Sequence, residues 1–497
     1  MSKFIPPSFD WKKSLILLFV VPVAIVLLVL RPATAKEAKH YTELEFPPLP
    51  ELELPDYDRY QLDNGMVVYL VGDRDLPLVR GTALIETGDR LEPESKVGLA
   101  SMVGQVLRTG GTEFHTPEQL NQLLEQRAAS VETEIETTAG RASFDTLSED
   151  LEEVFALFAE ILRYPAFDAQ QLELAKTQRA GAIARRNDNP DDIASREFQK
   201  LIYGNDSPYA RTIEYRTLDN IDRADVIEFY RQYFHPDRII LGIVGDFDTD
   251  EMRSLVTRYF GDWNPQKRRA KGDRPSLPPV SQAQTEGVYA IDRPQLTQSY
   301  IQLGHLGGQF DSPDYPALSV LNGVLNGFGG RLFNEVRSRQ GLAYSVYGFW
   351  SARYDYPGYF VAGGQTRSDA TVPFIEAIRT QIDRVRSEPV TPEELAYAKD
   401  STLNSFIFNF ANPAQTLSRL MRYEYYGYPS DFIFEYRRGV EATTIADVQR
   451  VAQKYLTPEQ LVTLVVGNDR AIEPPLSSLG NGTEVTAIDI SIPAPNS

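Results

Sequence analysis

The sequence predicts an α+β protein made of two homologous domains, each a mixed, largely antiparallel sheet with helices packed on one face, after an N-terminal hydrophobic segment. Three observations support this prediction. The chain of 497 residues is too long for one ordinary core. A set of ordered landmarks recurs in its two halves. Short β-branched runs also alternate with helical patterns in each half, as expected of layered α+β domains.

The first 35 residues are typical of a targeting segment. Lys12 and Lys13 precede the apolar run SLILLFVVPVAIVLLVL (14–30), and ATA (33–35) has the small residues of a signal-peptidase site. The run is long for a signal peptide and slightly short for a span of about 20 residues, so a cleaved signal peptide and a retained anchor both remain open. Because the lysines precede the run, both place the remainder outside the cytoplasm, in a bacterial periplasm or an equivalent lumen.

Composition divides the remaining chain. One stretch is acidic and rich in proline, and a second, NPQKRRAKGDRPSLPPVSQAQ, replaces apolar periodicity with charge, proline and serine. The end of the chain is rich in proline, serine and asparagine. The predicted segments are a signal peptide or anchor (1–35), a tether (36–55), an N-terminal domain (56–263), a linker (264–284), a C-terminal domain (285–475) and a tail (476–497).

Five landmarks appear in the same order in both predicted domains, and thirteen residues separate the proline from the tyrosine in each set. Such agreement predicts a duplicated domain. The first set is Asn189-Pro190, Ser195-Arg196, Tyr203-Gly204, Ala224-Asp225-Val226 and Val244-Gly245; the second is Asn412-Pro413, Ser418-Arg419, Tyr426-Gly427, Ala446-Asp447-Val448 and Val466-Gly467.

Local patterns predict individual elements. The runs GMVVYLVGD (65–73) and RIILGIVGDFD (238–248) are typical of strands. Thr116 as N-cap, followed by Pro117 and Gln119, predicts a helix that begins with a capping box. The stretch VGLASMVGQVLRTGG (97–111) predicts a helix whose buried stripe is Leu99, Met102, Val103, Val106 and Leu107, flanked by a face with Ser101, Gly104, Gln105 and Arg108.

Charge and residue content exclude several functions. A formal net charge of −19 leaves no basic excess for binding nucleic acid. Without cysteine, the chain has no disulfide, thiolate nucleophile or thiolate metal ligand. Its four histidines are His40, His115, His235 and His305, and no two of them lie within one helical turn of each other in sequence. A metal site assembled from these residues by folding would require long-range convergence, whereas a lone histidine is commonly structural.

The stretch DNGMVVYLVGDRDLPLV followed by TGDRLEPESKVGLASMVGQVLRTGGTE resembles the N-terminal domain of the pitrilysin and insulinase zinc peptidases, a group that includes mitochondrial processing peptidase. SPYARTI, VGDFD, DSPDYPAL and RLFNEVRSRQGLAYSVY are similar to later family landmarks, so the resemblance covers almost all of residues 55–475. In the family, the helix after GLA carries the inverted zincin signature H-x-x-E-H. The resemblance implies two histidines and a distal glutamate as zinc ligands, with the inner glutamate as general base.

This sequence departs from the family pattern at each of these positions. Ser101 and Gln105 stand where the histidines belong, and Gly104 stands at the general base. The distal glutamate is replaced by Gly181, or by its neighbour Ala182 if the count shifts by one. A catalytic zinc needs about three imidazole, thiolate or carboxylate ligands, which these residues do not supply. We therefore expect no zinc in this chain, and Arg108 on the same face disfavours a cation further.

The C-terminal domain retains another family feature. The resemblance places an arginine and a tyrosine seven residues apart, where they face the zinc site from the opposite domain, and Arg337 and Tyr344 match. A guanidinium and a phenol can donate hydrogen bonds to a substrate carbonyl or to its oxyanion. Two structural alternatives remain: Arg337 could cap its helix near Gly341, and Tyr344 could pack in a strand. Arg331 and the GFGG before it (327–330) are interpreted as serving the turn into this helix.

These observations predict a non-catalytic subunit of a heterodimeric zinc peptidase. The zinc would belong to a paralogous partner, and Arg337 and Tyr344 would contribute to binding the peptide substrate. A second hypothesis is a membrane-tethered scaffold or peptide-binding protein without a role in hydrolysis. An autonomous enzyme is the third, although the sequence contains no nucleophile elbow, and NGFGGR lacks the lysine and hydroxyl residue of a phosphate-binding loop.

Overall fold

The structure, a computed structural model, describes residues 56–263, 277–410, 412–480 and 484–495. All of these belong to one compact unit, Leu54–Ser497. The predicted targeting segment and tether, and residues 264–276 of the predicted linker, lie outside the described residues. No helix within the described ranges has both the length and the apolar character needed to cross a bilayer. Below, the first half means residues 56–263, and the second half means the described part of 277–495.

The first half contains a six-stranded sheet with the order β1-β2-β6-β3-β5-β4. All neighbouring strands are antiparallel except β2 and β6, which are parallel. In β6, residues on both faces are buried, because helices cover the two sides of the sheet. The strands are β1 (Asp58–Gln61), β2 (Val67–Gly72), β3 (Leu78–Ile85), β4 (Ser130–Ile135), β5 (Gly140–Leu147) and β6 (Ile239–Gly245).

The second half repeats this topology, with the order β12-β7-β11-β8-β10-β9. The parallel pair β7 and β11 corresponds to β2 and β6, and the remaining core strands are again antiparallel. The outermost strand differs, since β12 is parallel to β7 whereas β1 is antiparallel to β2. The strands are β7 (Gly287–Asp292), β8 (Gln298–Leu306), β9 (Ser345–Ser351), β10 (Tyr359–Arg367), β11 (Val462–Gly467) and β12 (Val485–Ala487).

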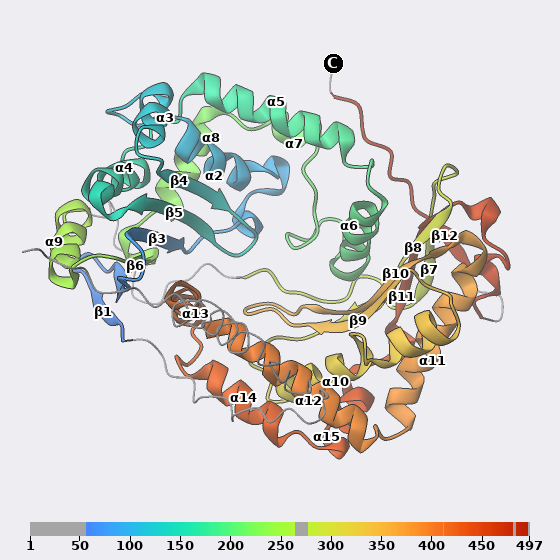
Figure 1. Cartoon of the computed structure of the whole chain (residues 1–497). Coiled ribbons are helices and arrows are strands. Elements are labelled where there is room, and N and C mark those ends of the chain that lie inside the picture. The colour runs from blue at the N-terminus through green and yellow to red at the C-terminus, as the bar shows by residue number, and fades with distance from the viewer. Residues whose placement is uncertain (1–55, 264–276, 411, 481–483, 496–497) are drawn as a thin grey trace, which may run out of the picture. The chain divides into compact units, whose positions relative to one another are not determined.

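Helices of each half pack on one face of its own sheet and form the main core there (Figure 1). In the first half these are α2 (Leu99–Thr109), α3 (Pro117–Glu125), α4 (Leu151–Arg163), α5 (Ala169–Arg185), α7 (Tyr215–Asp219), α8 (Arg223–Tyr233) and α9 (Thr249–Phe260). In the second half they are α10 (Tyr315–Leu325), α11 (Thr371–Ser387), α12 (Pro392–Phe406), α14 (Phe432–Ala442) and α15 (Ile445–Tyr455).

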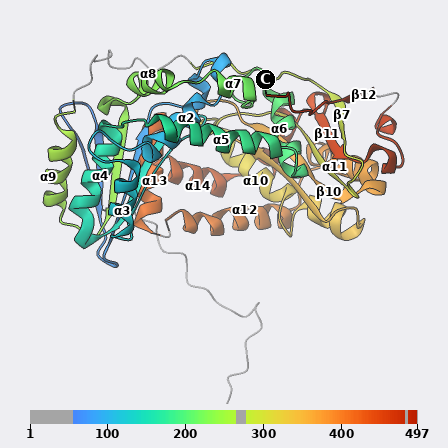
Figure 2. The same ribbon diagram turned by 90° about the horizontal axis from the view of Figure 1, so that it is seen from above.

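Two further helices are exchanged between the halves. α6 (Pro190–Tyr203) belongs to the first half by sequence but packs its apolar side on the second sheet, against strands β8, β10 and β11. α13 (Pro413–Tyr426) belongs to the second half and packs on the first sheet. Both helices are visible between the two sheets in Figure 1, and Figure 2 shows the same arrangement from above. Each sheet is therefore covered on one face by its own helices and on the other by a helix from the opposite half.

The exchange explains the repeated sequence landmarks. Asn189 and Asn412 cap the first turns of α6 and α13, and a proline follows each. Gly204 and Gly427, the glycines of the two Tyr-Gly pairs, have positive φ angles of 95° and 78° at the ends of these helices. Asp225 and Asp447 complete capping boxes at the starts of α8 and α15. The Val-Gly pairs end β6 and β11.

The structure confirms the predicted α+β fold class, and its two matching sheets agree with a duplicated domain. The predicted strands at 65–73 and 238–248 are β2 and β6, and the capping box at Thr116 begins α3. A helix on the second face of each sheet did not follow from the sequence. Part of the stretch interpreted as a tail is ordered as β12, which extends the second sheet, and the carbonyl of Ile490 accepts a hydrogen bond from Asn187 at 2.7 Å.

Candidate functional site

The helix at the degenerate zinc motif is α2, and its N-terminus is capped from a distance. Gly98 has a left-handed φ of 106° and no side chain to cap the helix. The carboxylate of Glu92 does so instead, since its two oxygens accept hydrogen bonds from the N–H groups of Gly98 and Ala100, each at 2.8 Å. Burial raises the pKa of Glu92 to about 7, although these two hydrogen bonds act in the opposite direction.

The predicted buried stripe of α2 is confirmed, because Leu99, Met102, Val103, Val106 and Leu107 are all at most 4% exposed. The prediction for the flanking face is only partly right. Ser101 and Gln105 contact α5, whereas Gly104 is buried against strand β4. Arg108 makes different contacts: its Nε donates a hydrogen bond to the Val131 carbonyl, and its Nη2 donates one to Asn121 Oδ1, both at 2.9 Å.

Gly104 allows an unusually close approach of α2 to β4. A Cβ atom at this position would lie 2.6 Å from the backbone nitrogen of Ile135 and 2.9 Å from the carbonyl carbon of Glu134. Thr133 in the same strand donates a hydrogen bond to the Gly104 carbonyl at 2.6 Å. The position that the family resemblance assigns to the general base therefore has no space for a side chain in this packing.

Side chains of α5 contact the two former histidine positions. Arg179 Nη2 donates to Ser101 Oγ at 2.6 Å, and Gln105 Nε2 donates to Gln178 Oε1 at 2.8 Å. Gly181 and Ala182, the candidates for the distal ligand position, are exposed, and a Cβ at Gly181 would meet nothing within 4 Å. A guanidinium and two amides thus occupy the α2–α5 face, which we define as Ser101, Gln105, Gln178 and Arg179.

This donor set does not fit zinc. Ser101 is a neutral hydroxyl that accepts a hydrogen bond from a cation, and the amides of Gln105 and Gln178 are neutral and poor ligands. Among the described residues, no three His, Asp or Glu side chains gather closely enough to hold a metal ion. The nearby Arg179 guanidinium would repel a divalent cation directly.

Two of the described histidines, His115 and His305, are held in structural contacts. His115 Nδ1 lies 2.8 Å from a carboxylate oxygen of Glu160. His305 is buried, which lowers its pKa, with Nδ1 2.8 Å from the Leu306 carbonyl and Nε2 accepting from the Thr457 N–H. His40 lies outside the described residues.

Arg337 and Tyr344 lie on the surface of the second half. Arg337 belongs to the π-helical turn η6 (Phe333–Arg339), and its guanidinium stacks at 5.0 Å from the ring centroid of Phe333. Tyr344 is 73% exposed, and its backbone N–H donates to the Gln365 carbonyl. Within the described ranges, neither side chain has a hydrogen bond or an ion pair, and no contact joins either of them to the α2–α5 face.

The residues around Arg337 and Tyr344 stabilise the loop, which is the role that the sequence predicted for Arg331. Arg331 is buried and forms a two-point ion pair with Glu394, with N–O distances of 2.7 and 2.9 Å. In the glycine-rich loop, the N–H of Gly329 donates to the hydroxyl of Tyr397, and Gly327 has a positive φ of 81°. Gly341 also has a positive φ, 64°, at the end of the turn. The ion pair and the glycines therefore shape the loop that presents Arg337.

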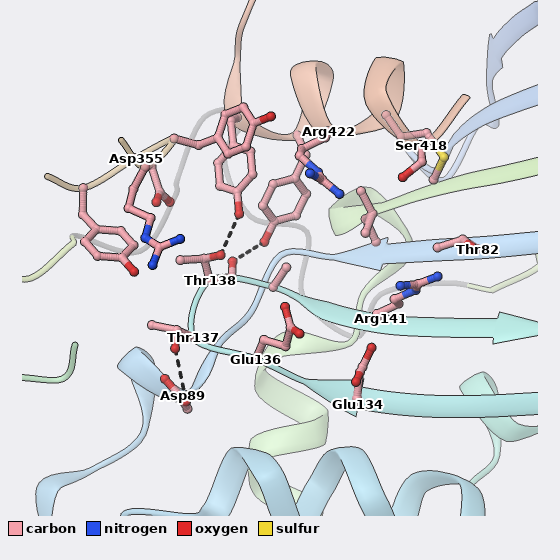
Figure 3. A pocket seen from close by; sticks show the side chains of 18 residues that line it. Thr82, Asp89, Glu134, Glu136, Thr137, Thr138, Arg141, Asp355, Ser418 and Arg422 are labelled. Carbon is pink, nitrogen blue, oxygen red and sulfur yellow. Dashed lines mark hydrogen bonds between the residues drawn. The ribbon is translucent and has the colours of Figure 1, made fainter. Parts of the chain in front are cut away.

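A cavity of about 610 Å³ lies where the two halves meet (Figure 3). The β4–β5 hairpin contributes Glu134, Glu136 and Arg141 to its lining, and α13 contributes Arg422. Hydrogen bonds across the cavity connect the halves: Tyr425 donates to the Thr138 carbonyl at 2.7 Å, and the hydroxyls of Tyr426 and Thr138 are 2.6 Å apart.

A buried ion pair between Arg90 and Asp355, at 2.7 Å, adds to this contact between the halves. Burial also raises the pKa of Asp89, beside Arg90, to about 6. These bonds run from the first half to the β9–β10 loop and α13 of the second. We therefore interpret the cavity as part of the contact between the halves.

Comparison with known proteins identifies the class. Two family models match the chain one after the other: "Insulinase (Peptidase family M16)" at residues 79–214 and "Peptidase M16 inactive domain" at residues 220–402. With the duplicated fold and the degenerate zincin helix, these matches show that the chain belongs to the M16 peptidase family.

Its relatives include proteins named both as peptidases and as non-peptidases. The chain is 24% identical to "Uncharacterized zinc protease YmxG" of Bacillus subtilis, over 82% of this chain and 97% of that protein. It is 23% identical to "Non-peptidase homolog YmxG" of Helicobacter pylori, over 77% of this chain and 87% of that protein. Overall similarity therefore does not distinguish the two classes, and the residues at the site must do so.

Solved structures show the same fold. A protein described as the peptidase M16 inactive domain from Pseudomonas fluorescens aligns with a TM-score of 0.73 and 24% identity, over 84% of this chain and all of that one. The periplasmic protease PqqL from Escherichia coli aligns with a TM-score of 0.70 and 16% identity, over 90% of this chain and 50% of PqqL.

Sequence reasoning missed the two α5 residues at the site. Arg179 and Gln178 lie one helical turn or less before the expected Gly181, so the register of α5 against α2 decides which residues face the motif. The signal available was an arginine and a glutamine two and three residues before Gly181, a spacing that places them within one helical turn of the expected distal position. The contact itself requires the tertiary structure.

Proposed function

We propose that this chain is the non-catalytic subunit of a two-subunit M16 metallopeptidase whose zinc is held by a paralogous partner. The proposal rests on a difference between the two halves: the first lacks zinc ligands, and the second keeps two substrate-binding donors. In the first half, the former zinc positions carry Ser101 and Gln105, and β4 fills the space for a general base at Gly104. In the second half, Arg337 and Tyr344 keep the family spacing and leave their polar groups free for an external acceptor. A chain that presents substrate-binding donors without a metal needs a partner for catalysis.

In this proposal Arg337 and Tyr344 act on the peptide held at the partner's zinc. A guanidinium and a phenol hydroxyl both donate hydrogen bonds, so they can bind a substrate carbonyl and stabilise the negative charge that develops on its oxygen. The N-terminal segment would place the complex outside the cytoplasm, and the periplasmic PqqL is a structural neighbour in agreement with this location.

Co-expression with a zinc-bearing paralogue tests the proposal. We expect the purified complex to cleave a peptide faster than the paralogue alone, and Arg337→Ala or Tyr344→Phe to lower kcat/KM about a hundred-fold without loss of assembly. Arg339→Ala is the matched control, since Arg339 is also exposed on the same turn but pairs with Glu335 at 2.9 Å. Cleavage equal to that of the paralogue alone would overturn the proposal.

The principal alternative is a scaffold or peptide-binding protein with no role in hydrolysis. The same experiment separates the two, because a scaffold would assemble with its partner but would tolerate Arg337→Ala and Tyr344→Phe without loss of activity. Zinc analysis of the separated subunits distinguishes a third possibility, an autonomous enzyme, which would hold about one zinc ion per copy of this chain.

A further inference from the structure

Among the described residues, the Arg179 guanidinium on the α2–α5 face has no anionic partner. Its hydrogen bond to Ser101 Oγ, at 2.6 Å, is the one hydrogen bond of this side chain among the described residues. No carboxylate in those ranges lies within 4.0 Å of it, although Arg186 on the same stretch pairs with Glu214. Arg179 is only partly exposed, and a cation in such a position gains from a charged acceptor more than a fully solvated one does.

The neighbouring groups can add further donors. Gln105 donates to the Oε1 of Gln178, which leaves the Nε2 of Gln178 without an acceptor among the described residues. The Ser101 hydroxyl accepts from Arg179, so its own proton is available for donation. Gly104 and Gly181 stand where the family has carboxylates, so the acidic groups that would repel an anion are absent at both positions. The four residues of the α2–α5 face thus offer several donors and one positive charge, and the cavity that Ser101 lines also contains the carboxylates of Asp89, Glu92 and Asp192 beside the guanidiniums of Arg196 and Arg211.

We propose that the α2–α5 face binds a peptide carboxylate, with Arg179 as its anchor. A planar guanidinium matches the two oxygens of a carboxylate, and its pairing through two parallel hydrogen bonds is stronger than a hydrogen bond between neutral groups. Because the chain belongs to a peptidase family, the carboxylate is either the C-terminus of a peptide or an acidic side chain. In this proposal, an anion binds at the position where the family holds its metal.

Isothermal titration of the full chain alone, without a partner subunit, tests this site independently of the proposed heterodimer. Three N-acetylated peptides of otherwise neutral sequence are compared: one with a free C-terminal carboxylate, its C-terminal amide, and the amide with one internal glutamate. We expect at least one carboxylate peptide to bind about ten-fold more tightly than the neutral amide. The C-terminal acid and the internal glutamate show which source of carboxylate is preferred.

Substitutions in α5 test whether Arg179 causes the preference for a carboxylate peptide over the neutral amide. Arg179→Gln should abolish the difference between the acid and the amide, and Arg179→Lys should retain part of it, because the charge remains without the fork geometry. Arg185→Gln is the matched control, an exposed arginine of the same helix that has no hydrogen bond to α2 among the described residues. Thermal unfolding confirms that each variant is folded. Equal binding of all three peptides, absence of binding, or a preference that survives Arg179→Gln would each overturn the proposal.

Discussion

At the scale of single residues, Gly104 and Gly181, which the family resemblance places where carboxylates are expected, lie in different environments. Gly104 lies where α2 meets β4, and a Cβ there would approach backbone atoms to 2.6 Å. Gly181 is open to solvent on α5, with nothing within 4 Å of the same position. Return of the zinc motif therefore needs a shift of α2 away from β4, in addition to new side chains. Packing against β4 excludes a general base at position 104, whereas no packing contact excludes a carboxylate at position 181.

These environments predict opposite effects of alanine. Gly104→Ala should lower the free energy of unfolding by about 1–3 kcal/mol, because the methyl group overpacks against a backbone that cannot yield. Gly181→Ala should raise it by about 0.5–1 kcal/mol, because alanine is the better helix former at an exposed position. Urea unfolding of the two variants measures both changes. A Gly104→Ala variant as stable as the parent would show that α2 and β4 are not in close contact.

At the scale of elements, the helix α2 depends on a carboxylate that lies outside it. Glu92 is 5% exposed, and both of its oxygens serve the N–H groups of the first turn. Burial raises its pKa to about 7 from the ordinary value of 4.5. The folded state therefore holds a proton on Glu92 more tightly than the unfolded state does. This contribution to stability is complete below about pH 4.5 and is lost as the pH rises through about 7.

Glu92→Gln should reduce the dependence of stability on pH. We expect the Glu92 site of the parent to contribute a loss of about 3 kcal/mol in the free energy of unfolding between pH 4.5 and pH 8. The variant should lack this part of the slope, and a smaller slope from Asp89, whose pKa is raised to about 6, should remain. Urea unfolding at several pH values measures the slopes. Glu94→Gln, two residues further at an exposed position, is the control, and a parent-like slope in Glu92→Gln would contradict the assignment.

At the scale of the whole described unit, the exchange of α6 and α13 makes the halves depend on each other. The second sheet completes its outer core with Phe198 of α6, which is 1% exposed and packs edge-on against Tyr359 at 5.8 Å. The first sheet is completed by Met421 of α13, whose sulfur would lie 2.2 Å from a Cβ at Gly242. Neither sheet can bury its second face without a helix from the other half.

Phe198→Ala should therefore destabilise both halves together, by about 3–5 kcal/mol. Chains that retain only Trp263, in the first half, or only Trp350, in the second, report the unfolding of each half by fluorescence. We expect coincident transitions that shift together in the variant. Phe114→Ala, at a side chain that is 63% exposed, should change stability by no more than about 0.5 kcal/mol. Two separate transitions, with the loss confined to one half, would disprove the coupling.

The sequence by itself determined the duplicated α+β fold and the positions of α2 and α3, and the family resemblance predicts that Ser101, Gly104 and Gln105 stand at the zinc-site positions. These features depend on periodicity, capping residues and side-chain chemistry, which are local properties of the chain. Only the tertiary structure decided that α6 and α13 change partners and that Arg179 lies beside Ser101. The physical reason is that contacts between elements depend on how surfaces far apart in sequence fit together, and no local pattern records that fit.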